Sequence, residues 1–512
     1  MRRWHGLYAV LLLLPSQASA QLNHIETAAQ LLSQGQVQQA ESEARLALDN
    51  PSTRPLGLAM LGTIRLQEGK YDESTSFLTQ ALTLNPRLVG ARTTLGNSYL
   101  LQGKLESARK SFQEALRLDP SNFNARLDLA KVEASLHNYQ QSLTVAAPIA
   151  NQLRDSDEGL LLLATNYGSL GRKEDLKALI PSWEHLPTPA EETSLEFGNT
   201  VALFGLTAEA QKIFETVEAK NVLNPSPSTA LQLAQSYMSL RIFDRAEQNF
   251  QSSLSVDPAC AACEQGLAQI AEQQGDTEKA LAHLIAAKRQ APEDPEILFQ
   301  FGKICLQRNL PDDALPALAK AVQLKPDQDS YVYVLASANV AKNHLPEAAS
   351  LFAQLLQKHP QDAVLKYALG AVDFLQGNYD EAESSLKQSL KMQPDQVAAS
   401  YYLALTYDAI GQDEQSVVVF RDLLRHHPDH APSYVKLGSI LASQHLYDQA
   451  QPLLERAVSL DPKSVQAHYQ LGLLLRRLGK TEESDNHLAE SRKLEAERSS
   501  QTELKLRLLL PD

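Results

Sequence analysis

The chain has 512 residues, which is too long for one ordinary globular core and favours several domains or an array of repeats. Hydrophobic residues make up 43% of the chain and charged residues 21%, a balance that excludes an intrinsically disordered protein. The formal net charge of −14 argues against nucleic acid as a partner and against charge-driven binding to an anionic membrane, because both surfaces are themselves negative.

The first twenty residues have the pattern of a secretory signal. Arg2 and Arg3 give a positive start, residues 7–14 form an apolar run, and the small residues 18–20 predict cleavage after Ala20. The apolar run is too short to span a bilayer, which needs about 20 residues, so we expect no membrane span after cleavage. Cleavage leaves 45 basic residues (47 less two arginines) against 61 acidic ones, a charge of −16. With no permitted Asn-x-Ser/Thr acceptor in the sequence, the signal indicates a periplasmic or secreted protein of the bacterial envelope.

The rest of the chain is periodic. One unit, residues 89–122, carries Gly96, Tyr99, Ala108, Phe112 and Pro120. A Gly or Ala recurs at the place of Gly96, an Ala at the place of Ala108, and a Pro at the place of Pro120. The prolines keep a spacing of 34 residues through Pro258, Pro292, Pro326, Pro360, Pro394, Pro428 and Pro462.

This pattern resembles the tetratricopeptide repeat, and only the early Trp of that family is missing, where Arg92 stands instead. The resemblance implies an all-α fold, a right-handed α-solenoid superhelix of antiparallel helix pairs with about fourteen repeats. We expect a signal peptide at 1–20, N-terminal repeats at 21–156, degenerate repeats with a bend at 157–226, regular C-terminal repeats at 227–498 and a tail at 499–512.

Each recurring residue type has a mechanical reason. A small residue in the first helix lets the second helix approach closely, and a large residue in either small slot would overpack the pair. The proline ends the second helix, because it lacks an N–H and clashes with the preceding turn. We expect the recurring phenylalanines to fill the gap between neighbouring repeats: Phe112, Phe250, Phe352 and Phe420.

The stretch 157–226 keeps the repeat length but loses much of the signature. Pro181 should cut a second helix short, Trp183 stands where Ala is usual, and Pro225 is displaced by three residues, which implies a small insertion. One interpretation is sequence drift in a tolerant repeat. The other is a bend that presents Trp183 to a partner.

Cys260 and Cys263 form the single motif with redox potential, at the start of a first helix. They could be reduced structural residues, a short structural disulfide in an oxidising compartment, or a redox pair, although a thioredoxin-like role needs a strand–helix context that a solenoid lacks. Cys305 is expected to be a buried thiol.

Two further sets of side chains could bind a ligand. His426, His427 and His430 could approach a metal, but no further ligand completes a shell by spacing, and a solvated turn explains them as well. In the family, first helices line the concave face and offer positions two, five, six, nine and twelve to ligands. At the fifth position an aromatic ladder repeats, which could grip a peptide or pack within its own repeat: Phe299, Tyr333, Tyr367, Tyr401 and Tyr469, with Tyr402 beside it and Val435 filling one rung.

The tail alternates in polarity from Glu503 and becomes wholly apolar towards Pro511, so it could fold back on the last repeat or dock onto a partner. The sequence lacks phosphate-binding loops, zinc-protease motifs and serine-hydrolase motifs, and it predicts neither a metal nor a cofactor. We therefore expect a non-enzymatic scaffold of the envelope that holds protein or peptide segments. The alternatives are an accessory subunit of a polysaccharide-synthesis or secretion machine, and a thiol-redox protein acting through Cys260 and Cys263.

Overall fold

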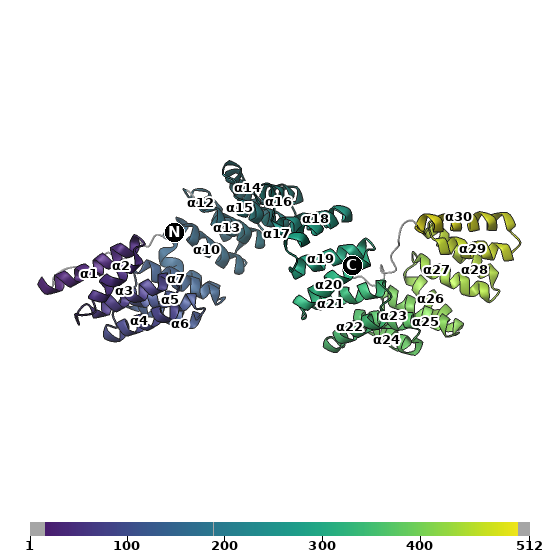
Figure 1. The fold of residues 1–512 in the computed structure, drawn as a ribbon, viewed down its shortest axis with the longest axis horizontal. Helices are drawn as coiled ribbons and strands as arrows, with labels where there is room; N and C mark the ends of the chain where they lie inside the picture. The colour runs from purple at the N-terminus through teal and green to yellow at the C-terminus, as the bar shows by residue number, and fades with distance from the viewer. Residues whose placement is uncertain (1–15, 188, 500–512) are drawn as a thin grey trace. The chain divides into compact units, whose positions relative to one another are not determined.

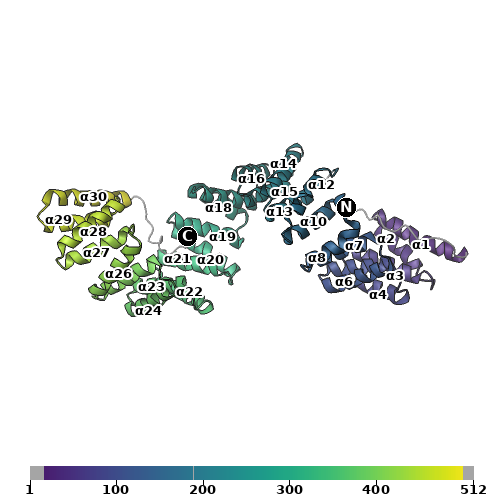
Figure 2. The ribbon, with the colours of Figure 1, turned by 180° about the vertical axis from the view of Figure 1, so that it is seen from behind.

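A computed structural model of the protein describes residues 16–187 and 189–499, and all regular elements within these ranges are helices. They follow one another as fourteen pairs, each with a first and a second helix, as Figures 1 and 2 show from opposite sides. The predicted all-α solenoid of about fourteen repeats is confirmed. The chain divides into two compact units, Met1–Asn249 and Phe250–Asp512, with the division inside a second helix, and each unit is described by itself.

The first helices share a length of 13 or 14 residues except at the N-terminal end, where α1 has 18. They are α1 (Ser16–Ser33), α3 (Arg54–Gln67), α5 (Val89–Leu101), α7 (Phe123–Ser135), α10 (Asp157–Ser169), α13 (Glu191–Leu203), α15 (Pro227–Ser239), α17 (Ala261–Gln273), α19 (Pro295–Gln307), α21 (Asp329–Ala341), α23 (Ala363–Gln376), α25 (Val397–Ala409), α27 (Ala431–Ser443) and α29 (Val465–Arg477).

The second helices vary more, and two of them are interrupted. They are α2 (Val37–Leu46), α4 (Tyr71–Leu84), α6 (Leu105–Leu118), α8 (Tyr139–Ala146) continued by η1 (Ala147–Ile149) and α9 (Ala150–Arg154), α11 (Lys173–Lys177) continued by α12 (Ile180–Glu184), α14 (Thr207–Leu223), α16 (Phe243–Val256), α18 (Thr277–Gln290), α20 (Pro311–Leu324), α22 (Leu345–Lys358), α24 (Tyr379–Met392), α26 (Asp413–His426), α28 (Tyr447–Leu460) and α30 (Thr481–Ser499).

Within a repeat, the two helices touch at the predicted small slots. A Cβ added to Gly96 would lie 2.5 Å from Cε1 of Phe112, and one added to Gly302 would lie 2.4 Å from Cγ of Leu318. A side chain of the second helix therefore fills the space that any side chain larger than hydrogen would need at these places. The alanines of the opposite slot are fully buried: Ala108, Ala246, Ala280, Ala314, Ala348, Ala382 and Ala450.

Phenylalanine rings of the second helices pack on glycines of first helices in two ways. Phe112 packs on Gly96 of its own repeat, whereas Phe250 packs on Gly266 of the following repeat. The expectation that these rings fill the gap between repeats is confirmed for Phe250. It is also confirmed for Phe112, whose ring fills the space that its own glycine leaves and belongs to one buried cluster with Ala125, Leu129 and Val132 of the next first helix.

The turn between the helices of every repeat contains one residue with a left-handed backbone. Its φ is positive at fourteen described residues spaced about one repeat apart, nine glycines such as Gly103 (φ 72°) and five others such as Arg241 (φ 59°). Glycine adopts this conformation without a steric penalty, so it is the commonest residue here.

The second helices end two residues before the turn proline. Thus α6 ends at Leu118 and Asp119 is already extended (φ −135°, ψ 90°) in front of Pro120. The ring of proline disfavours the helical conformation in the residue before it, and this stops the helix. An Asp, Asn or Ser side chain caps several of the first helices, as Asp294 does by accepting hydrogen bonds from the N–H groups of Glu296 and Ile297.

The irregular stretch behaves as its prolines predict. The second helix containing Pro181 is split into the two five-residue helices α11 and α12, and the displaced Pro225 follows α14, which has 17 residues where regular second helices have 14. Trp183, however, is buried and stacks on Phe197 with ring centroids 4.1 Å apart. The hypothesis that Trp183 is presented to a partner is therefore wrong, since its ring is used inside the first unit.

Both predicted terminal features lie mainly outside the described residues. The positive start and apolar run of the signal precede Ser16, and the tail follows Ser499. Helix α1 includes the predicted cleavage point after Ala20, so cleavage there would remove its first five residues.

Substitutions at three glycines of one repeat distinguish the stability cost of a steric contact from that of a strained backbone. We expect Gly96→Ala to destabilise α5 and α6 by about 1–3 kcal/mol through overpacking. Gly103→Ala should cost about 1 kcal/mol through its positive φ alone, because nothing lies within 4 Å of its added Cβ. Gly90→Ala, in a helix and equally unobstructed, should stabilise by up to about 1 kcal/mol. Native-state hydrogen exchange of α5 and α6 measures all three, and wild-type exchange in Gly96→Ala would contradict the close approach.

Candidate peptide-binding face

The predicted aromatic ladder lies at the fifth position of the first helices, but its rings are used for packing. Tyr333 meets Phe352 of its own second helix edge-on, with ring centroids 5.3 Å apart, and Tyr401 meets Phe420 in the same way at 5.9 Å. Phe299 instead stacks on Tyr331 of the next first helix at 4.5 Å. The fifth position thus faces neighbouring helices within the solenoid.

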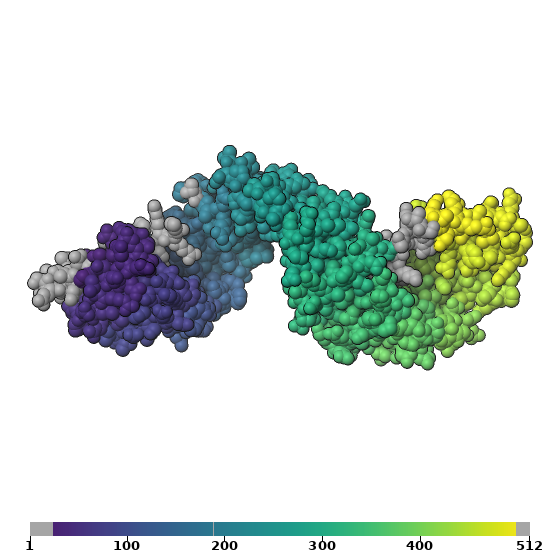
Figure 3. Space-filling model, in the orientation of Figure 1, coloured from purple at the N-terminus to yellow at the C-terminus, as the bar shows by residue number. Residues whose placement is uncertain are grey.

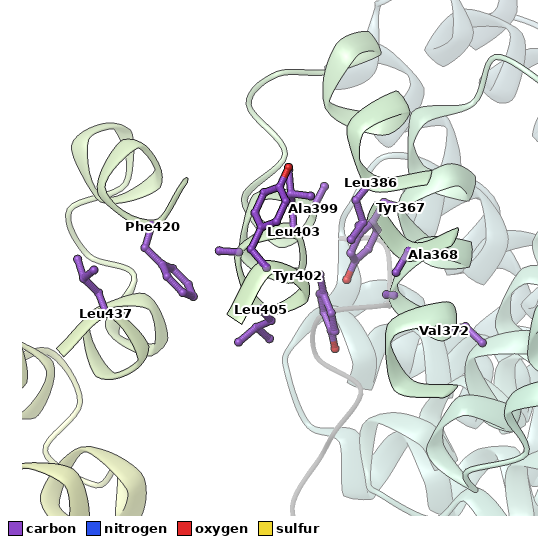
Figure 4. Close-up of a cluster of buried hydrophobic side chains, with 14 of the residues drawn as sticks. Tyr367, Ala368, Val372, Leu386, Ala399, Tyr402, Leu403, Leu405, Phe420 and Leu437 are labelled. Carbon is purple, nitrogen blue, oxygen red and sulfur yellow. The ribbon is translucent and has the colours of Figure 1, made fainter. Parts of the chain in front are cut away.

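Burial of the ladder agrees with this packing. Tyr367 and Tyr402 are buried, with ring centroids 6.1 Å apart, and lie side by side in Figure 4. Burial raises the pKa of Tyr333 and of Tyr401 to about 12. Tyr469 alone among the predicted ring residues is exposed. Peptide binding by these rings stays a prediction, and substitution of the buried ones to Ala would damage the core before it tested binding.

A different set of first-helix residues is largely apolar, and it includes both buried and exposed side chains. Positions two, six, nine and thirteen follow a spacing of four, three and four residues, which places them on one helix face. On α21, α23 and α25 these positions are apolar or aromatic except for Ser330 and Ser337. We call them the apolar strip: Val334 and Ala341 on α21, Val364, Ala368, Ala371 and Leu375 on α23, and Ala398, Tyr402, Leu405 and Ala409 on α25. Figure 4 shows Tyr402 and Leu405 on the same side of α25.

The repeats on either side of the strip carry polar residues at the same positions. On α19 they are Glu296, Gln300, Lys303 and Gln307, and on α27 they include Lys436 and Ser439. These polar side chains reach between neighbouring first helices: Lys303 Nζ lies 2.8 Å from Glu272 Oε1 of α17, and the Ser439 hydroxyl lies 3.4 Å from Gln470 Oε1 of α29. The positions therefore lie on the face lined by first helices, and the strip is bounded by polar repeats at both ends.

Exposure varies along the strip. Its ends are open, with Val364 38% and Leu375 44% exposed. Its centre is buried at Ala371 and Leu405, although the equivalent Lys303, Ser439 and Leu473 are half-exposed.

One carboxyl group lies at the twelfth position of α25, beside the strip. Burial raises the pKa of the Asp408 carboxyl above its ordinary value, an effect that nearby Lys436 offsets in part and Asp413 reinforces. A cationic group from a ligand would stabilise the charged form of Asp408.

Sequence reasoning chose the fifth position and missed the strip. The signal was present, because positions two, six, nine and thirteen are all apolar in α23 and α25 and half apolar in α21, while polar residues flank them. What the sequence could not supply was that the conspicuous tyrosines turn towards their own second helices.

The cysteine motif forms a disulfide. Cys260 and Cys263 are joined, Cys263 is fully buried, and its Sγ lies 3.3 Å from the Ser253 hydroxyl. Cys305 is a buried free thiol whose pKa burial raises to about 12, so it is a poor nucleophile near neutral pH. The burial of Cys263 favours a structural disulfide over a redox-active pair.

One histidine of the 426–430 turn, His430, packs within its repeat. His430 lies edge-on to Tyr401, with ring centroids 5.3 Å apart, and its Nδ1 is 2.7 Å from the Ser433 hydroxyl. Burial lowers the pKa of His430. Among the described residues, no group of three His, Cys, Asp or Glu side chains is arranged to hold a metal ion.

No helix between residues 16 and 499, Thr188 aside, combines the length and apolar character that crossing a bilayer requires.

In a comparison with known families, sequence profiles of the tetratricopeptide repeat match this chain. The matched residues are 57–88, 96–136, 231–295, 299–363, 373–439 and 435–484. No curated protein matches the chain in sequence.

Several solved structures resemble parts or most of the chain. YrrB, described as a TPR protein with an unusual peptide-binding site, is 22% identical over 36% of this chain and 95% of its own, with a TM-score of 0.35. The Cut9–Hcn1 hetero-tetramer of APC/C matches at 15% identity over 96% of this chain and 97% of the other, with a TM-score of 0.42. Yeast Tom70 matches at 14% identity over 89% and 99%, with a TM-score of 0.33.

Proposed function

This chain belongs to the tetratricopeptide-repeat family, and from that premise we propose that it is a non-catalytic scaffold that binds protein or peptide segments on its apolar strip. The observation that carries the proposal is the strip itself, which is apolar on α23 and α25 and in part on α21, between repeats whose equivalent positions are polar. Contiguous apolar surface bounded by polar residues is typical of interaction sites.

The strip offers suitable contacts for a segment of polypeptide. Its open ends, Val364 and Leu375, can each bury apolar area against a partner, worth about 1.5–3 kcal/mol when burial is complete. The buried ring of Tyr402 packs on Tyr367 and Phe374 and so holds α25 against α23, the helix that carries both open ends. Asp408 favours a partner that carries a basic residue beside its apolar ones.

A non-catalytic role agrees with the helical repeats that make up the described part of the chain. Helix pairs account for the described residues from α1 to α30, and these leave no room for a separate catalytic domain. The disulfide lies at the N-terminus of α17, and Cys263 is fully buried. This burial supports a disulfide that stabilises the fold rather than one that is reduced and reoxidised in catalysis.

We also propose that the protein acts in the bacterial envelope. The signal-like start and the disulfide support this, because disulfides persist in oxidising compartments. In cells that make the protein, we expect the osmotic-shock fraction to contain a chain whose N-terminal peptide begins at Gln21, as read by mass spectrometry. A chain that retains Met1 and stays with the cytosol would contradict this location.

The binding face can be tested with exposed residues that the core does not need. We expect Val364→Lys with Leu375→Lys to reduce capture of partners from envelope extract by at least about tenfold, because two desolvated lysines oppose apolar contact. The matched control is Val418→Lys with Met392→Lys on second helices, where these side chains are 65% and 39% exposed.

Circular dichroism should show both double variants folded as the wild type is. Quantitative mass spectrometry of the captured proteins then compares them. If the strip variant retains the wild-type set at wild-type abundance, the strip is not the binding face.

A further inference from the structure

A pair of side chains that recurs in three repeats has a different composition in the last one. The residue four places before the small Gly or Ala of a first helix lies against the residue 19 places later, on the second helix of the same repeat. We call these two positions the paired slot. His24 Nδ1 lies 2.5 Å from Glu43 Oε2 across α1 and α2, and His283 Nδ1 lies 2.7 Å from Glu264 Oε2 across α17 and α18. In both repeats the slot joins an imidazole to a carboxylate.

In the last repeat the paired slot holds two imidazoles. His468 on α29 and His487 on α30 lie with their Nδ1 atoms 3.0 Å apart and their ring centroids 5.1 Å apart. Helices α29 and α30 pack along each other as the last helix pair, at the yellow end of the ribbon in Figures 1 and 2, and α30 is yellow in Figure 3. Because this pair contains no carboxylate, it cannot form the ion pair that the other two slots can form.

A backbone carbonyl fixes the position of the proton on His468. Its Nε2 lies 3.1 Å from the carbonyl oxygen of Pro462, which can only accept, so Nε2 carries the proton and Nδ1 keeps its lone pair. The equivalent carbonyl of Pro86 accepts from Arg92 in an earlier repeat, so the contact belongs to the repeat itself. It holds the ring with Nδ1 towards His487. Histidines that bind metals are usually held in this way, with one nitrogen on a carbonyl or carboxylate and the other on the ion.

We propose that His468 and His487 together bind a divalent transition-metal ion such as Zn²⁺ through their Nδ1 atoms, and that the ion joins α29 to α30. Two ligands of a tetrahedral zinc ion, with bonds of about 2.0–2.1 Å, lie about 3.3 Å apart. The 3.0 Å between the two nitrogens is close to this value, and a small rotation of the half-buried His487 ring supplies the difference. The Nδ1 proton of His487 moves to its Nε2 through solvent, so both rings bind as neutral imidazoles. This site does not rest on peptide binding by the apolar strip.

The surroundings of His487 suit a cation. Burial lowers the pKa of His487 and the neighbouring His468 lowers it further, so the ring is neutral near neutral pH, as a metal ligand must be. The carboxylates of Glu483 and Glu455 act on the same ring in the opposite direction, and their charges would offset that of a bound ion. Among residues 16–187 and 189–499 no third ligand is already in place, so water completes the shell. Imidazole nitrogens suit Zn²⁺, Cu²⁺ and Ni²⁺, whereas Mg²⁺ prefers oxygen.

A bound ion would stabilise the end of the array. Helix α30 is the last helix of the described residues, and an array of repeats depends on its terminal repeat being held in place. An ion that binds only when α29 and α30 are paired favours the paired state in proportion to its occupancy.

Titration calorimetry of the full-length protein with ZnCl₂ tests the site. In His487→Gln the amide can still donate a hydrogen bond to Nδ1 of His468, so the variant keeps this contact but loses a metal ligand. We expect His487→Gln to weaken Zn²⁺ binding at least about tenfold. The matched control is His283→Gln, whose slot holds a single imidazole, and it should bind Zn²⁺ as the wild type does. MgCl₂ should not compete. Equal affinities of wild type and His487→Gln, or no Zn²⁺ binding by the wild type, would overturn the proposal.

A gain of binding supplies an independent check. Glu264→His places a second imidazole opposite His283, in the geometry of the last repeat, and should add about one equivalent of bound Zn²⁺ per chain. An unchanged stoichiometry in a variant with wild-type circular dichroism would contradict the role given to the slot.

Hydrogen exchange locates the ion. Zn²⁺ should slow amide exchange in α29 and α30 several-fold in the wild type but not in His487→Gln. Slowing confined to the turn at 426–430, or absent from α30, would overturn the proposal even if calorimetry detects a bound ion.

Discussion

The contact between a small residue of each first helix and a large side chain of the second helix is the constraint on which the rest of this protein depends. Gly96 against Phe112 and Gly302 against Leu318 leave no room for a methyl group. Because the contact recurs once per repeat, it sets the distance between the two helices of every pair. No repeat buries its apolar face alone, so the stack is stable only as an array.

This close pairing also decides which residues remain for binding. The bulky fifth-position rings, such as Tyr333 and Tyr401, are drawn into contact with Phe352 and Phe420 and become part of the core. The helix face about a quarter turn away from the fifth position points towards neighbouring first helices and the space beside them. There, three repeats are apolar and their neighbours polar. We propose that binding specificity in this scaffold comes from this local change of side chains on an unchanged backbone.

Much of the fold could be predicted from the sequence, because spacing carries it. The 34-residue interval and the small residues at the places of Gly96 and Ala108 determine the helix pairs, and Pro181 and Pro225 correctly marked a split and a lengthened helix. The left-handed turn was less visible, since Arg241 and four other residues stand where glycine is usual.

The candidate site was predicted less well, for a physical reason. Position along a helix gives direction only to within a fraction of a turn, so the sequence alone could not say whether Tyr367 faces a ligand or its own repeat. The two interpretations for Trp183 stayed open in the same way, because its stacking partner Phe197 lies in the next repeat. A better signal for the candidate site was the change from polar to apolar first-helix faces between successive repeats. This signal compares equivalent positions of different repeats, so it does not depend on the direction of a single side chain.

The most direct test of the account is to footprint a complex with a captured partner by hydroxyl radicals, reading side-chain oxidation on every helix of the second unit. The account predicts that the exposed Val364 and Leu375 lose reactivity on binding while Val418 and Met392, on second helices, keep theirs. Protection of Val418 and Met392 with an unchanged apolar strip would contradict it.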